Sequence, residues 1–60
     1  MLTAEVKPLS GWPTDQLTRA YRLAVRDLHE AVAAGRTADI AASEEEAAMF
    51  AGELVRRGAL

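Results

Sequence analysis

The 60-residue sequence contains no cysteine and a single histidine, His29. Without cysteine there are no disulfide bonds, no thiolate metal ligands and no cysteine nucleophile. One histidine does not build a structural zinc site alone. A chain this short buries only about 60% of the surface that its unfolded form exposes. Because small domains usually add disulfides, a metal or oligomerisation, we expect no cofactor or metal here and a fold completed by another protein chain.

Long apolar runs are also lacking, and no stretch approaches the ~20 residues that span a bilayer. The N-terminus, MLTAEVKPLS, does not have the basic start and apolar run of a signal peptide. The formal net charge is −2, and nucleic-acid binding usually needs a basic surface. We therefore expect a cytoplasmic protein that binds neither membrane nor nucleic acid.

Motifs of catalysis are missing as well. There is no glycine-rich phosphate loop and no nucleophile elbow. The carboxylates of Glu44, Glu45 and Glu46 would point in three directions around a helix, so they do not converge on an ion. Sixty residues leave no room for a preorganised pocket. We expect that the protein is not an enzyme.

Aromatic residues are scarce: one Trp, one Tyr and one Phe. Trp12 stands in SGWPTDQL, directly before Pro13, which holds it extended. It is either an exposed hot spot for a partner or a staple that folds back onto Leu17 or Tyr21. We favour the staple because a small core needs its large apolar groups.

Residues 1–13 contain both prolines and form the predicted N-terminal arm. Leu2, Ala4 and Val6 alternate with polar residues, which is the period of a half-buried strand, and Pro8 ends any ladder. A single short strand is not stable alone, so the arm is either paired with another copy or simply extended.

Residues 14–60 predict a helical hairpin. Thr14 is the expected N-cap of a helix over about 15–34, and Gly35 follows its end. Its apolar seam, at spacings of four and three, is Leu17, Tyr21, Ala24, Leu28 and Ala31.

The second helix has two candidate starts, a cap at Thr37 or a capping box at Ser43 in SEEE. We favour Thr37 because residues 38–42 contain no helix breaker, and we expect the helix to end at Gly58. The seam of this helix is Ile40, Glu44, Ala47, Ala51 and Leu54, in which Glu44 is the one charged residue.

A two-residue connection between these helices predicts an antiparallel hairpin, so the fold class is all-α. One hairpin has only two layers and leaves part of its apolar surface uncovered. We expect the surplus at Val25, Val32, Phe50 and Val55, and we expect two hairpins to bury it as a four-helix bundle.

Helix 1 also carries a basic stripe, Arg19, Arg22 and Arg26. It could contact an acidic partner surface, or it could be a solvated face with i, i+4 pairs to Asp15 and Glu30. Together these features favour a small protein-binding module: a regulator, an inhibitor or antitoxin-like factor, or an accessory subunit. It would form homo-oligomers, bind a larger protein, or both.

An alternative rests on the segments LTAEVK and GRTADI. A strand followed by two helices with a glycine turn and a capped second helix resembles the ribbon–helix–helix DNA-binding family. That resemblance implies a dimeric regulator that lays paired N-terminal strands in the major groove. The expected first helix is longer than the usual one in that family, and the arm has a single basic residue, Lys7.

Overall fold

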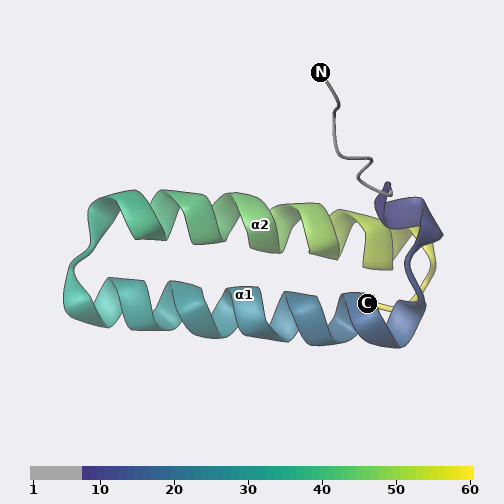
Figure 1. Ribbon diagram of the computed structural model, residues 1–60, viewed down its shortest axis with the longest axis horizontal. Helices are drawn as coiled ribbons and strands as arrows, with labels where there is room; N and C mark the ends of the chain where they lie inside the picture. The colour runs from purple at the N-terminus through teal and green to yellow at the C-terminus, as the bar shows by residue number, and fades with distance from the viewer. Residues whose placement is uncertain (1–7) are drawn as a thin grey trace, which may run out of the picture.

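The computed structural model describes residues 8–60 as an antiparallel helical hairpin (Figure 1). A short 3-10 helix, η1 (Leu9–Gly11), precedes two long helices, α1 (Thr14–Ala34) and α2 (Thr37–Arg56). The helices run side by side along their whole lengths, and the predicted all-α hairpin is confirmed. The predicted strand falls on residues 1–7, which lie outside the described residues.

The turn between the helices needs only two residues because Gly35 takes a left-handed conformation, with φ at 70°. The Gly35 N–H donates to the carbonyl of Val32, and the Arg36 N–H donates to the carbonyl of Ala31 at 3.0 Å. These bonds satisfy carbonyls at the end of α1 that have no partner within the helix. The glycine predicted after the first helix therefore sets the reversal of the chain.

The prediction that Thr14 caps α1 is wrong. Pro13 occupies the N-cap position with extended dihedrals, no side chain caps the helix, and Thr14 is its first helical residue. The Pro13 carbonyl accepts the first helical bond, from the Leu17 N–H at 3.1 Å. The Thr14 hydroxyl instead accepts a hydrogen bond from the Arg57 guanidinium at 2.9 Å.

The predicted start of the second helix near Thr37 is confirmed over the alternative at Ser43, but the prediction that Thr37 caps the helix is wrong. Thr37 is the first helical residue and Arg36 is the N-cap, again without a side-chain cap. Ser43 lies in the middle of the helix and is buried, whereas Glu44 is exposed. The predicted place of Glu44 in the seam is therefore wrong, because the small serine at the neighbouring position faces α1.

The buried core is small. Its fully buried apolar residues are Leu17, Ala24 and Ala31 on α1 and Leu54 on α2. The three from α1 recur every seven residues, which places them on one line along the helix. Leu17 and Leu54 are the only large side chains among residues 8–60 that are fully buried. Alanine and serine elsewhere in the seam let the helices approach closely but add little apolar surface.

The residues before α1 fold back onto α2. Pro8 accepts a backbone hydrogen bond from Gly11, and Leu9 accepts one from Trp12, which closes η1. This short helix contacts α2 near its C-terminal end (Figure 1). The described part of the predicted arm thus contains a helical turn, with extended residues before it, at Pro8, and after it, at Trp12 and Pro13.

Candidate functional site

Trp12 packs against Phe50, with ring centroids 5.9 Å apart and planes tilted by 42°. Both side chains are half-buried. The sequence predicted that Trp12 would fold back onto Leu17 or Tyr21 of α1, but its aromatic partner, Phe50, lies on α2. Phe50, predicted among the uncovered residues, is therefore partly covered by Trp12.

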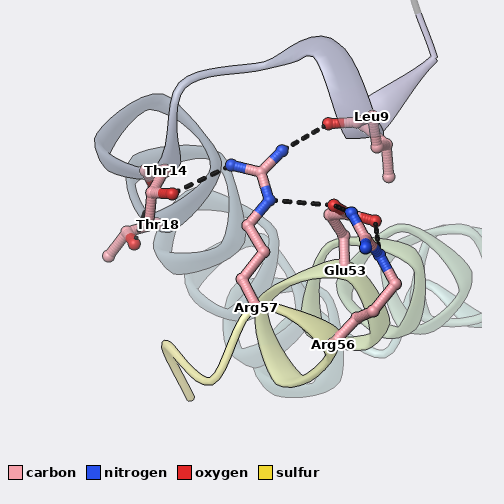
Figure 2. Close-up of polar contacts among 6 residues, drawn as sticks. All are labelled: Leu9, Thr14, Thr18, Glu53, Arg56 and Arg57. Atoms are coloured by element: carbon pink, nitrogen blue, oxygen red, sulfur yellow. Dashed lines mark hydrogen bonds and ion pairs between the residues drawn. The ribbon is translucent and has the colours of Figure 1, made fainter.

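Arg57 joins three segments at the end of the hairpin that is remote from the turn (Figure 2). Its guanidinium donates to the Thr14 hydroxyl at 2.9 Å, to the Leu9 carbonyl at 2.8 Å and to the Glu53 carboxylate at 2.8 Å. The Arg57 side chain is only 17% exposed. One side chain thus ties η1 and the start of α1 to the end of α2.

Glu53 holds this arginine in place. Its carboxylate accepts hydrogen bonds from both Arg56 and Arg57 and is 11% exposed. These bonds favour the ionised form and lower the pKa of Glu53 from 4.5 to about 2. The bond from Arg56 has the larger effect and the bond from Arg57 the smaller. The same contact with Glu53 raises the pKa of Arg56. The cluster is therefore fully charged at neutral pH.

An open hollow of about 280 Å³ lies near the turn, between the two helices. Its lining is mostly charged: Asp27, Glu30, Arg36, Asp39, Ala42 and Ser43. Arg36 and Asp39 form an ion pair at 2.9 Å. Within residues 8–60 no three His, Cys, Asp or Glu side chains gather in a way that could hold a metal ion.

The other side of the hairpin is apolar. On α1 an apolar row with spacings of four, three and four residues contains Tyr21, Val25, Leu28 and Val32. This row lies beside the buried row of α1, on the side away from Asp27 and Glu30. On α2 the corresponding row contains Ile40, Ala51 and Val55, with Glu44 and Ala48 between them. We call these residues of both helices the apolar face.

The residues of the apolar face differ in exposure. Val32 is 57% exposed and Val55 is 59% exposed, whereas Val25 is half-buried. Two of the four residues predicted as surplus thus present more than half of their surface to solvent. These exposed side chains could contact another apolar surface.

The basic stripe lies outside the seam. Arg19, Arg22 and Arg26 are all exposed. Arg26 forms the expected ion pair with Glu30, at 3.3 Å, but the expected pair between Asp15 and Arg19 is not formed. The stripe therefore presents positive charge to solvent.

The cluster of Arg57 with Leu9, Thr14 and Glu53 was not predicted from the sequence. The signal in the sequence was the position of two consecutive arginines three and four residues after Glu53, a spacing that favours ion pairs within a helix. The contacts of Arg57 with Leu9 and Thr14 join residues more than forty positions apart, and no periodicity within one helix announces them.

Comparisons with known proteins add no identity: no protein-family model, curated protein or solved structure matches the chain. Neither helix of the described residues is long and apolar enough to cross a membrane.

Proposed function

We propose that the protein is a small non-enzymatic protein-binding module that forms a homodimer, a four-helix bundle of two hairpins, and acts on a larger partner through its helical surfaces. The observation that carries this proposal is the apolar face, on which Val32 and Val55 are more than half exposed. A hairpin with two layers covers each helix on one side only. A second hairpin on the apolar face completes the core.

The small core supports the same proposal. Only two large side chains, Leu17 and Leu54, are fully buried among the described residues. Burial of one such side chain contributes about 1.5–3 kcal/mol, while ordering the backbone of each residue costs about 1–2 kcal/mol. Self-association adds buried apolar surface without lengthening the chain, and disulfides are not available to this sequence.

Surfaces for a larger partner remain on the outside of such a bundle. The exposed arginines Arg19 and Arg26 lie on the outer side of α1, and Met49 is 56% exposed on the outer side of α2. Arginine and methionine are both enriched in protein interfaces. The pattern suits a regulator, an inhibitor or antitoxin-like factor, or an accessory subunit.

The alternative, a ribbon–helix–helix-like regulator that binds DNA, depends on a strand within residues 1–7, outside the described residues. The described helices do not favour it, because α2 presents Glu44, Glu45 and Glu46 to solvent. A mobility shift on genomic DNA fragments that disappears in Lys7→Ala would establish this alternative. We expect no shift at physiological salt.

Sedimentation equilibrium over a wide range of protein concentrations tests the homodimer. The expected result is a species of twice the 6.5 kDa chain mass that dissociates on dilution. Val32→Asp should shift the equilibrium to monomer, because it buries a charge in the bundle. Ala33→Asp is the matched control: it places the same charge one residue further along α1, off the apolar face, and should leave the mass unchanged. A folded monomer at every concentration would refute the homodimer.

A further inference from the structure

The hairpin sets which residues of α1 and α2 lie level with one another. Leu17 and Leu54 are equally far from the turn and are both fully buried. Thr14 and Arg57, again equally far from the turn, are joined by a hydrogen bond. Residues equidistant from the turn therefore lie side by side, and this register extends over the whole hairpin (Figure 1).

The two sides of the hairpin differ in what covers them. One side holds the charged hollow near the turn, and Phe50, two helical turns after Ser43, lies on that same side beneath Trp12. The apolar face is on the opposite side. A second copy therefore has one broad apolar surface to pack against, since the other side is occupied by charges and by the residues before α1.

Charges at the apolar face have opposite signs on the two helices. Arg22 borders it on α1, three residues before Val25, and Glu44 lies within it on α2, four residues after Ile40. Both are exposed, and neither forms an ion pair with any residue of 8–60. Arg26, Arg36, Arg56 and Arg57 do find acidic partners within the chain. Arg22 and Glu44 are thus available to a second copy.

We infer that a second copy of the chain covers the apolar face with its own apolar face, so that α1 of each copy lies against α2 of the other and both turns lie at the same end. This inference rests on the proposed homodimer and specifies its geometry. The twofold axis then runs parallel to the helices, and every helix has antiparallel neighbours.

Charge decides between this arrangement and its alternative. If α1 packed against α1 across a perpendicular twofold axis, Arg22 of one copy would lie near Arg26 of the other. In the inferred arrangement, Arg22 lies level with Met49 of the partner copy. Glu44 of that copy is five residues away, about 7.5 Å along the axis at 1.5 Å per residue, a span that an arginine side chain can cross. Opposite charges then meet on both sides of the dimer, and like charges do not.

Engineered cysteines test this geometry cleanly because the natural sequence has none. Val25→Cys places a thiol on the α1 part of the apolar face, and Ala48→Cys places one on the α2 part, close to the same level. Each variant is oxidised alone, and then the two are unfolded together, refolded as a mixture and oxidised. We expect a covalent dimer in the mixture and none with either variant alone. Glu30→Cys, on the opposite side at the hollow, is the matched control and should stay unlinked.

The outcomes separate the geometry from the homodimer itself. Sedimentation of each reduced variant first shows whether it dimerises, and circular dichroism shows whether it is folded. A dimer that links Val25→Cys or Ala48→Cys to itself would overturn the inferred arrangement and leave the homodimer intact. A monomer would overturn both. Val32→Cys with Ala41→Cys, one heptad towards the turn, repeats the test if the first pair does not fold.

Discussion

Arg57 donates a hydrogen bond to the hydroxyl of Thr14 at 2.9 Å and thereby joins the last turn of the hairpin to its first (Figure 2). The same guanidinium reaches the carbonyl of Leu9. A hairpin has one covalent connection between its helices, at Gly35 and Arg36, so the opposite end is free to splay. Arg57 adds polar contacts that close this end, beside the buried side chains of Leu17 and Leu54.

Arg57→Ala should therefore destabilise the protein by about 1.5–3 kcal/mol, the range for hydrogen bonds to charged groups. Arg57→Lys should recover only part of this, because an ammonium group lacks the planar fork that reaches three acceptors. Arg56→Ala is the matched control: Arg56 contacts Glu53 alone and its side chain is 63% exposed. Urea unfolding followed by circular dichroism measures all three. Equal losses for Arg56→Ala and Arg57→Ala would contradict the special role of Arg57.

The low pKa of Glu53 predicts a loss of stability in acid. In the unfolded chain its pKa returns towards the ordinary value of 4.5, while the fold holds it at about 2. The unfolded state therefore binds more protons between these values. The stabilisation is complete above about pH 5 and is lost as the pH falls towards 2.

Urea midpoints measured across this pH range should fall steeply for the natural protein. Glu53→Gln should lower the midpoint at neutral pH and flatten its dependence on pH. Glu45→Gln, a change at an exposed glutamate of the same helix, should leave the slope as it was. An unchanged slope in Glu53→Gln would show that other carboxylates cause the acid sensitivity.

The packing of Trp12 against Phe50 should be visible in the stability of the protein and in the fluorescence of Trp12. Removing a large aromatic side chain from a core costs about 3–5 kcal/mol, and Trp12→Ala should cost less because Trp12 is half-buried. Phe50→Ala should shift the fluorescence emission of Trp12 to longer wavelength, since it exposes the indole. Tyr21→Phe keeps an aromatic ring at a position on α1 and should leave the emission unchanged. Identical emission in Phe50→Ala would mean that the rings do not pack in solution.

The two fully buried leucines should dominate the stability of the core. Leu17→Ala and Leu54→Ala should each cost about 2–5 kcal/mol, enough to unfold a domain of this size. Leu23→Ala is the matched control on α1, because Leu23 is 51% exposed and lies off the seam. Its effect should stay within about 0.5 kcal/mol. Thermal unfolding of the three variants measures these losses of stability. A larger loss in Leu23→Ala than in Leu17→Ala would mean that the core lies on another side of α1.

Helix periodicity and glycine positions were sufficient to predict the hairpin. The spacing of Leu17, Ala24 and Ala31 places them on one side of α1, and Gly35 marks the reversal, so both helices and the turn follow from local pattern. The burial of Ser43 in the seam could not be predicted in the same way, because a search for hydrophobic residues does not select a serine. Whether a small side chain contacts a second helix depends on how closely the two helices pack. Trp12 was expected to pack on α1, since nearby residues are the simplest partners, but η1 turns it towards α2.

Gly52 gives the last prediction. It lies within α2, four residues before the helix ends at Arg56, it is exposed, and a Cβ atom added there would meet no atom within 4 Å. Glycine within a helix costs about 1 kcal/mol relative to alanine, so Gly52→Ala should stabilise the protein by up to that amount. Gly35→Ala has as much room but a φ of +70°, so it should destabilise by about 1–2 kcal/mol. Thermal unfolding at low and at high protein concentration compares the two variants. A loss of stability in Gly52→Ala at the higher concentration alone would mean that another chain packs closely on Gly52, three residues before Val55 at the edge of the apolar face.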